Sequence, residues 1–258
     1  MITSLSNAKV KLVRSLARRR ARYAAQQFVI EGVRLIEEAV GAGIAPALVL
    51  YAARTEDDPR SRTLLDRLRA ATPEVYAASD AVMQAVSSTE TPQGIVAVVP
   101  FLALPLPAQP QFVLILDAVR DPGNVGTILR SARAAGVDVV FFAPGTADPY
   151  NDKVVRAAMG AHFHLPIRVS AWKEIRELVE MIPRVYLADA RGEIDYARAD
   201  WARPVVLIVG GEAEGASDAA KEIATARVSI PMRGGAESLN AAMAATVLLF
   251  EAARPAYA

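Results

Sequence analysis

Hydrophobic and polar positions along the chain follow two patterns, the repeat of an amphipathic helix and the short apolar runs of buried strands. In the first hundred residues these patterns predict helices over 8–22, 33–40, 60–71 and 81–86 and strands over 28–30, 47–51, 74–77 and 95–99. Gly41 and Gly43 end the second of these helices. Residues 1–100 are therefore predicted to form a complete small α/β domain.

Residues 101–110 contain three prolines in their last six positions, which is typical of a semi-rigid linker. Beyond it, the pattern predicts strands over 112–116, 137–142, 164–167, 185–188, 205–209 and 227–230 and helices over 125–135, 152–159, 173–181, 217–224 and 239–253. Strands that are apolar on both faces and alternate with helices indicate a parallel sheet covered on both sides. Residues 111–258 are therefore predicted to form a second, larger α/β domain.

Composition limits the chemistry that the chain can perform. Its 258 residues are 22% charged, with a net charge of +1, and they include no cysteine and two histidines. Thiolate catalysis and cysteine-ligated metal sites are excluded, and no metal site is expected. His162 and His164 are interpreted as structural residues at the start of a strand. With no run of 18 apolar residues and no signal-peptide pattern, we expect a cytoplasmic protein without a membrane segment.

The N-terminal segment is strongly basic although the chain as a whole is nearly neutral. Seven basic residues precede the first acidic residue, Glu31: Lys9, Lys11, Arg14, Arg18, Arg19, Arg20 and Arg22. Such a patch suits the phosphate backbone of a nucleic acid, since binding there is driven by counterion release. The alternative interpretation is an ordinary solvated helix face.

Polar residues and glycines follow three of the predicted strands in the second domain. In parallel α/β sheets, ligands bind outside the carboxyl ends of the strands. The first loop leads through Asn124, a candidate helix cap, to Arg130 about one and a half turns later. The second loop joins Gly210 and Gly211 to Glu212, whose carboxylate suits hydroxyl or cationic groups better than phosphates; a salt bridge or helix dipole is the alternative.

The third loop, residues 230–240, runs from a strand end through Gly234 and Gly235 to the last predicted helix. Either Ser238 or Asn240 can cap that helix, and a cap needs only one of them. The extra polar residue indicates a loop shaped around a ligand.

Together, the three loops resemble the signature segments of SpoU/TrmH-type RNA 2′-O-ribose methyltransferases of the SPOUT superfamily. The resemblance rests on Asn124-x-Gly126-x-x-x-Arg130, on Gly210-Gly211-Glu212-x-x-Gly215, and on Ile230-Pro231-Met232 through Ser238-Leu239-Asn240, in that order. Residues 28–38 and 89–98 also resemble the substrate-binding domain that often precedes these enzymes. The resemblance therefore covers nearly the whole chain.

This resemblance implies an α/β catalytic domain whose C-terminal segment forms a deep trefoil knot, preceded by a smaller RNA-binding domain. It implies S-adenosylmethionine as cofactor, RNA as substrate and a homodimer whose active site is assembled by two subunits. A ribosomal RNA is a more typical substrate of members with such a front domain than a transfer RNA. The residues implied for cofactor binding are Gly210, Gly211, Glu212, Ile230, Met232 and Leu239.

The catalytic residues implied by the resemblance are Arg130, Asn124, Glu212, Ser238 and Asn240. A guanidinium with a pKa above about 12 is hard to deprotonate, so we expect Arg130 to stabilise the developing ribose alkoxide electrostatically rather than to act as a base. The other four would position Arg130, the RNA or the cofactor. Lys153 and Arg156, one helical turn apart, can contact RNA phosphates together with the basic N-terminal residues, or can form a surface ion-pair face.

Two departures from the family pattern stand in the second and third segments. Ala213 occupies a position where the family often has glycine, and Ala241 and Ala242 replace the more usual valine and serine. Two other functions are compatible with parts of the sequence. One is a catalytically silent RNA-binding protein, and the other is a nucleotide-dependent oxidoreductase on a Rossmann sheet. The G-x-G-x-x-G fingerprint that the oxidoreductase requires is missing.

Overall fold

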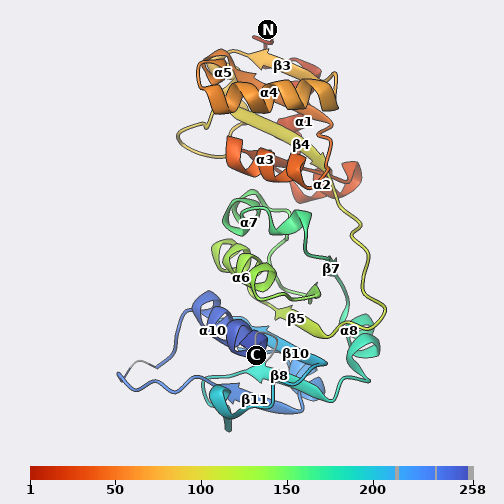
Figure 1. Ribbon diagram of the computed structural model, residues 1–258, viewed down its shortest axis with the longest axis vertical. Coiled ribbons are helices and arrows are strands. Elements are labelled where there is room, and N and C mark those ends of the chain that lie inside the picture. Colours follow the sequence, from red (N-terminus) through yellow and green to blue (C-terminus); the bar gives the residue numbers. More distant parts are fainter. Residues whose placement is uncertain (213–214, 236, 255–258) are drawn as a thin grey trace. The chain divides into compact units, whose positions relative to one another are not determined.

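The computed structural model describes residues 1–212, 215–235 and 237–254. The chain divides into two compact units, the first made of residues 1–102 and 150–163 and the second of residues 103–149 and 164–258 (Figure 1). In this division, residues 150–163 group with residues 1–102. The domain boundaries expected from the sequence stay a prediction.

The first unit is built around a four-stranded mixed sheet. Its helices are α1 (Ala8–Ser15), α2 (Arg19–Ala25), α3 (Val33–Gly41), α4 (Pro59–Ala71), α5 (Asp80–Val86) and α7 (Asp152–Ala158), with 3₁₀ turns η1 (Ala53–Glu56) and η2 (Ala161–Phe163). Its strands are β1 (Gln27–Glu31), β2 (Leu48–Ala52), β3 (Val75–Ala78) and β4 (Ile95–Pro100), in the order β1-β4-β2-β3. Strand β4 is antiparallel to both neighbours, and β2 and β3 are parallel.

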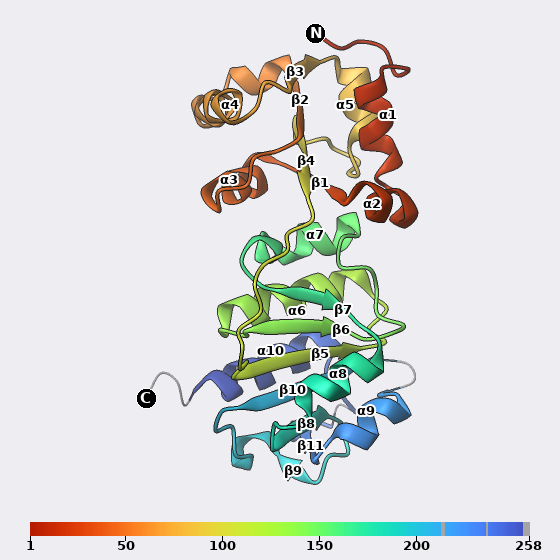
Figure 2. The same cartoon turned by 90° about the vertical axis from the view of Figure 1, so that its right-hand side faces the viewer.

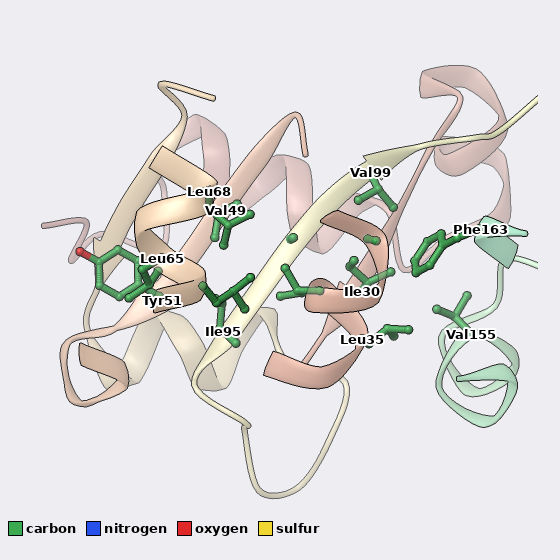
Figure 3. Close-up of a cluster of buried hydrophobic side chains, with 14 of the residues drawn as sticks. Ile30, Leu35, Val49, Tyr51, Leu65, Leu68, Ile95, Val99, Val155 and Phe163 are labelled. Carbon is green, nitrogen blue, oxygen red and sulfur yellow. The ribbon is translucent and has the colours of Figure 1, made fainter. Parts of the chain in front are cut away.

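Side-chain alternation along β4 gives this sheet a core on each face. Ile95, Ala97 and Val99 join the cluster formed with α3 and α4, part of which is drawn in Figure 3. Val96 and Val98 join the opposite cluster, formed with α1 and α5. Figure 2 shows these two helix pairs on either side of the sheet. The sheet is therefore the middle layer of a three-layer unit.

The basic N-terminal segment forms two helices where the sequence predicts one over residues 8–22. The break follows α1, and Arg18 takes an extended conformation before α2. Its physical reason lies in Arg22, which is 4% exposed and donates from Nη1 to the carbonyl oxygens of Leu16 and Ala17, at 2.9 Å each. A buried guanidinium thus satisfies carbonyls that the end of α1 leaves without helical partners.

The second unit is built on a seven-stranded sheet in which every pair of neighbours is parallel, as the sequence predicts. Its strands are β5 (Phe112–Asp117), β6 (Val139–Phe142), β7 (Ile167–Val169), β8 (Arg184–Ala188), β9 (Ile194–Asp195), β10 (Val205–Gly210) and β11 (Ala226–Ser229). Its helices are α6 (Pro122–Ala134), α8 (Trp172–Val179), α9 (Asp218–Ile223) and α10 (Ala241–Ala253), with the 3₁₀ turn η3 (Tyr196–Arg198). The strand order is β7-β6-β5-β10-β8-β11-β9.

The strand expected over residues 164–167 is present, but it begins three residues later than expected. Strand β7 begins only at Ile167, because Pro166 has no N–H to donate to a sheet ladder. His162 lies instead in η2, where its side chain is buried, and His164 is exposed in the connecting loop. Neither histidine starts a strand.

Helices cover both faces of the parallel sheet, so its central strands are buried on both sides. Helices α8 and α9 pack on one face, over a cluster that contains Val113 and Ile208, and α6 and α10 pack together on the other (Figure 2). The C-terminal trefoil knot implied by the resemblance stays a prediction. Among the described residues, no helix is long and apolar enough to span a bilayer.

Candidate active site

Strands β5 and β10 are neighbours, and their carboxyl ends meet in register, with Gly210 paired to Asp117. The first two glycine-containing loops predicted from the sequence therefore start side by side at one edge of the sheet. In parallel α/β proteins this edge is the usual place of the ligand site. Helix α10, which follows the third loop, packs against both α6 and β10.

A hydrogen-bonded cluster joins one residue from each loop. The Asn124 amide donates to Glu212 Oε1, and the Asn240 amide donates to Asn124 Oδ1 at 3.0 Å and to Glu212 Oε1 at 3.3 Å. The backbone N–H of Ala241 also reaches Glu212 Oε1, at 3.4 Å. One carboxylate oxygen thus ties together three segments that lie far apart in the sequence.

The helix caps at this site differ in part from those expected. Asp121, not Asn124, caps α6, because its carboxylate accepts from the backbone N–H of Asn124 at 2.7 Å. This leaves the Asn124 side chain free to bind Glu212. Asn240 does cap α10, accepting from Ala242 N at 2.9 Å and Met243 N at 3.3 Å.

The two alanines after Asn240 contribute through their backbone. Ala241 donates its N–H to Glu212, and Ala242 donates its N–H to the Asn240 side chain. The Ala242 side chain is buried against the core of the unit. Replacing the usual valine and serine therefore removes no contact that this cluster uses. The other departure, Ala213, lies outside the described residues.

Gly210 and Gly211 are required by close backbone packing. A Cβ on Gly211 would lie 2.4 Å from the carbonyl oxygen of Ala118, and one on Gly210 would lie 2.9 Å from the Ala216 nitrogen. Ala118 itself has a φ of +54°, which is unusual for a residue with a side chain. The first and second loops therefore touch through main-chain atoms.

Sequence reasoning assigned no role to Asp117, the last residue of β5. Its side chain is fully buried, and its Oδ2 accepts from Ser217 N at 2.6 Å, which anchors the segment that follows the second loop. The sequence did carry a signal for this role, because Asp117 ends an otherwise apolar strand. A buried Asp is rare without a partner, so its position predicts a hydrogen-bonded carboxylate.

A cavity of about 100 Å³ opens at this edge. It is lined by Ala118, Val119, Arg120, Asp121, Gly211, Glu212 and Gly215. This volume is below the roughly 300 Å³ at which ligand pockets begin, so further residues must complete a site for a whole cofactor. Ile230 and Met232 are half-buried and Leu239 is 37% exposed, and these residues of the third loop are the predicted candidates.

Two of the predicted catalytic residues lie outside the hydrogen-bonded cluster. Arg130 is exposed on α6, and Ser238 is exposed in the third loop. Among the residues that the structure describes, neither side chain has a hydrogen-bond or ion-pair partner. Arg130 is thus open to a ligand or a partner molecule.

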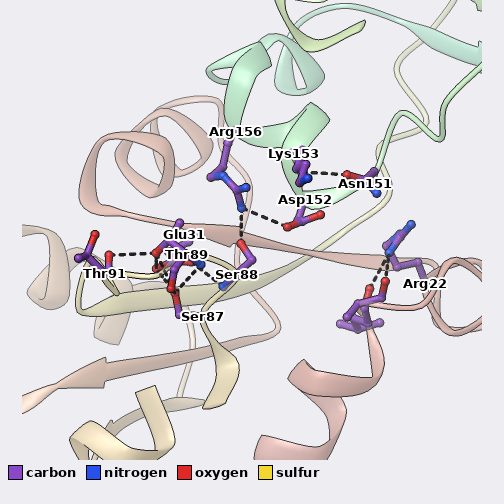
Figure 4. Close-up of polar contacts among 12 residues, drawn as sticks. Arg22, Glu31, Ser87, Ser88, Thr89, Thr91, Asn151, Asp152, Lys153 and Arg156 are labelled. Carbon is purple, nitrogen blue, oxygen red and sulfur yellow. Dashed lines mark hydrogen bonds and ion pairs between the residues drawn. The ribbon is translucent and has the colours of Figure 1, made fainter. Parts of the chain in front are cut away.

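The predicted RNA-binding residues all belong to the first unit. Lys11, Arg14, Arg18, Arg19 and Arg20 are exposed, whereas Arg22 is buried as described above. Lys9 forms an ion pair with Glu74, and that hydrogen bond raises the pKa of the Lys9 ammonium. On α7, Lys153 is exposed and Arg156 donates to Ser88 Oγ and, at 3.2 Å, to Asp152 (Figure 4).

The described parts of the chain contain no group of three or more His, Asp or Glu side chains placed to hold a metal ion. The donor set at the sheet edge is made of carboxylates, amides and exposed backbone. Carboxylates suit a sulfonium group and ribose hydroxyls, and glycine backbone suits close approach by a purine. These residues fit S-adenosylmethionine in their chemistry.

The fold and the site define an α/β enzyme with its ligand site at the carboxyl ends of parallel strands. Residues 111–250 match the SpoU rRNA Methylase family, and residues 7–97 match the MRM3-like substrate binding domain. The chain belongs to the SpoU rRNA methylase family, as the sequence motifs predict.

Two relatives are similar over nearly the whole chain. The 23S rRNA (guanosine(2553)-2′-O)-methyltransferase RlmP of Bacillus subtilis is 36% identical, covering 96% of this chain and 97% of its own length. The 23S rRNA (uridine(2479)-2′-O)-methyltransferase of Streptomyces viridochromogenes is 37% identical, covering 93% and 86%.

Solved structures agree with this assignment. The SpoU methyltransferase AviRb from Streptomyces viridochromogenes, in complex with S-adenosylmethionine, has a TM-score of 0.87 at 34% identity and covers 98% of this chain and 99% of its own. An S-adenosylmethionine-bound rRNA methyltransferase from Sinorhizobium meliloti has a TM-score of 0.86 at 31% identity and covers 98% and 97%.

Proposed function

We propose that this chain methylates a ribose 2′-hydroxyl of 23S ribosomal RNA, with S-adenosylmethionine as the methyl donor. Membership of the SpoU rRNA methylase family makes it an S-adenosylmethionine-dependent RNA 2′-O-methyltransferase. The 23S rRNA substrate is proposed from the two relatives described above. Since one of them methylates a guanosine and the other a uridine, the proposal names the RNA and not the nucleotide. A cytoplasmic location is part of the same proposal.

The observation that carries the proposal is the cluster of Asn124, Glu212 and Asn240. It fixes the ends of all three signature segments around one carboxylate oxygen, beside the cavity at the sheet edge. A preorganised wall of this kind can hold a reacting methyl group and a hydroxyl in line. We assign these residues to positioning, together with the cofactor-facing backbone of Gly210 and Gly211.

When bound, S-adenosylmethionine supplies an electrophilic methyl group on a sulfonium. The 2′-hydroxyl proton passes to solvent water, and Arg130 is the residue assigned to stabilise the negative charge that develops on the ribose oxygen. A guanidinium carries N–H donors and no acceptor, so Arg130 stabilises charge instead of accepting a proton. Its exposure and its lack of a partner within the described residues leave it available to the RNA.

We propose that the enzyme acts as a homodimer. Helix α10 carries an apolar stripe on its outer face, made of Met243 (63% exposed), Val247 (37%) and Phe250 (45%). Exposed apolar patches of this kind mark interaction surfaces. Helix α10 packs beside α6, which carries Arg130, so a second copy on this stripe would bind one helix away from that residue.

Methyl transfer to unmethylated 23S rRNA, followed by mass-spectrometric mapping of 2′-O-methyl groups, tests the proposed function. The wild type is expected to add one methyl group at a ribose. Arg130→Ala should lower the methyl-transfer rate by about 10²-fold or more while keeping cofactor affinity. Arg133 is an exposed arginine of the same helix, and Arg133→Ala should keep most of the methyl-transfer rate. An Arg130→Ala protein with near-wild-type rates would rule out this role. A wild type that binds rRNA and transfers no methyl group would identify a silent RNA-binding protein instead.

A further inference from the structure

A second cavity, of about 310 Å³, lies within the first unit, and nothing in the proposed methyl transfer uses it. It is lined by Val13, Arg14, Leu16, Ala17, Arg22, Val29, Glu31, Ala85, Val86, Ser87, Ser88, Tyr150, Asp152, Val155 and Arg156. Helices α1, α5 and α7 and strand β1 all contribute to these walls. The volume falls in the size class of a small ligand.

The lining has an apolar floor and a polar rim. Val13, Leu16, Val86 and Val155 are each at most 7% exposed, so they form the deep part. Arg14 and Ser88 are exposed and lie at the mouth. An apolar hollow that is open to water is unfavourable unless something covers it, and such hollows mark binding sites.

Polar contacts hold the rim in place. Glu31, 6% exposed at the end of β1, accepts from Ser87 Oγ at 2.7 Å and from Ser88 N at 3.2 Å (Figure 4). It also accepts from Gln93 N at 3.1 Å. On the other side, Arg156 bridges Ser88 Oγ and the Asp152 carboxylate. The cavity is therefore preformed, which lowers the entropic cost of binding a ligand.

The electrostatics of the rim favour an anion. The two acidic residues are already engaged, since Glu31 accepts several hydrogen bonds and Asp152 is paired with Arg156. Arg14 has no side-chain partner among the described residues, and Lys11 lies one turn before it on the same face of α1. An arginine open at the mouth above an apolar floor matches a ligand with a flat apolar body and a phosphate.

We propose that this cavity binds one unpaired nucleotide of the substrate RNA, with the base on the apolar floor and a phosphate at Arg14. The inference rests on the proposed function, because it takes RNA as the substrate. Unpaired nucleotides expose a base that can enter a cavity, whereas paired ones do not. Tyr150 also lines the cavity, and Lys11 continues the basic path along α1 for a neighbouring phosphate.

Two RNA hairpins with the same stem test the proposal, one fully paired and one with a single bulged 2-aminopurine nucleotide. Affinities are measured with the full chain by fluorescence anisotropy, without S-adenosylmethionine. The wild type should bind the bulged hairpin about tenfold tighter. Ala85→Leu, which fills the cavity from α5, should abolish this preference, and Ala81→Leu, exposed on the same helix and outside the cavity, should preserve it.

A second pair of variants tests the phosphate contact and does not depend on filling the cavity. Arg14→Ala should lower the slope of log affinity against log salt by roughly 0.7 to 0.9 for the bulged hairpin. Arg67→Ala, an exposed arginine of α4 that does not line the cavity, should leave the slope unchanged. Circular dichroism melting of all four variants checks that each one folds.

Equal wild-type affinity for the two hairpins would overturn the proposal, and so would a folded Ala85→Leu protein that keeps the full preference. These results are separable from the proposed function, because the binding measurements contain no methyl donor. A protein that prefers the bulged hairpin and never methylates RNA refutes only the methyl transfer. A protein that methylates RNA and shows no preference refutes only the nucleotide cavity.

Discussion

Gly211 shows how strongly a single residue limits this site. A Cβ there would lie 2.4 Å from the Ala118 carbonyl oxygen, a distance that real Cβ atoms do not adopt, so any side chain must push the first and second loops apart. Both loops line the cavity at the sheet edge. The position thus links backbone packing directly to the shape of the proposed cofactor site.

We expect Gly211→Ala to weaken S-adenosylmethionine binding by about tenfold or more, because the loops that line the cavity must separate. Isothermal titration calorimetry measures the change. Gly41→Ala, at the end of α3, is the matched control, since its added Cβ has no atom within 4 Å, and it should raise stability by roughly 0.5 to 1 kcal/mol. Unchanged cofactor affinity in Gly211→Ala would mean that this loop is not part of the cofactor site.

Asn240 combines two functions that substitutions can separate. Its Oδ1 caps α10, and its Nδ2 donates to Asn124 and Glu212. Asn240→Ala should cost about 1 kcal/mol of stability by losing the cap, whereas Asn240→Ser keeps a capping oxygen and should cost less. Both should lower methyl transfer, because both lose the amide contacts. Chemical denaturation and methylation rates measure the two effects, and full activity in a stable Asn240→Ser protein would contradict the positioning role.

At the scale of elements, an ion pair joins α3 to α4 in the first unit. Arg60 Nε donates to the Glu37 carboxylate at 2.9 Å and 3.1 Å, and this hydrogen bond lowers the pKa of Glu37. A carboxyl whose folded-state pKa lies below its unfolded value of about 4.3 stabilises the fold above that pH. The contribution is lost as the pH falls through the folded-state pKa.

Glu37→Gln should therefore lower the free energy of unfolding at pH 7, by less than about 1 kcal/mol since the Arg60 side chain is 55% exposed, and should make little difference at pH 3. Urea unfolding at both pH values measures the free energy of unfolding of the variant and of the wild type. Glu177→Gln, exposed on α8, controls for the loss of a negative charge. An equal loss of stability for Glu37→Gln at the two pH values would show that the ion pair with Arg60 does not stabilise the fold.

The elements themselves were largely predictable because their signals are local. The apolar runs of β5 and β10 predict buried parallel strands, and the structure confirms them. The break between α1 and α2 was missed, since it depends on Arg22 folding back onto carbonyls of the preceding helix. The choice of Asp121 over Asn124 as a cap was also missed, because both have the right chemistry within one turn.

Long-range contacts were beyond the reach of sequence patterns. The motifs named Asn124, Glu212 and Asn240 as site residues, but their shared hydrogen bonds join positions 88 and 116 residues apart. The cavity in the first unit was even less predictable from the sequence than the hydrogen-bonded cluster. Its walls combine α1, α5 and α7, and periodicity within one helix gives no information about which other helices lie beside it.

At the scale of the whole molecule, the outer face of α10 decides whether the enzyme pairs with a second copy. Met243 is 63% exposed in the apolar stripe of the proposed interface, and Met181 is 88% exposed elsewhere on the same unit. Met243→Glu would place a carboxylate in the interface, where burial without a partner is costly, so we expect a shift from dimer to monomer. Met181→Glu makes the same chemical change away from the stripe and should leave the mass unchanged. Sedimentation velocity measures the mass of each variant in solution. A dimeric Met243→Glu protein, or a monomeric wild type, would contradict pairing through α10. Because Arg130 lies on the helix beside this stripe, a monomeric Met243→Glu protein should also lose most of its methyl transfer while keeping its affinity for RNA.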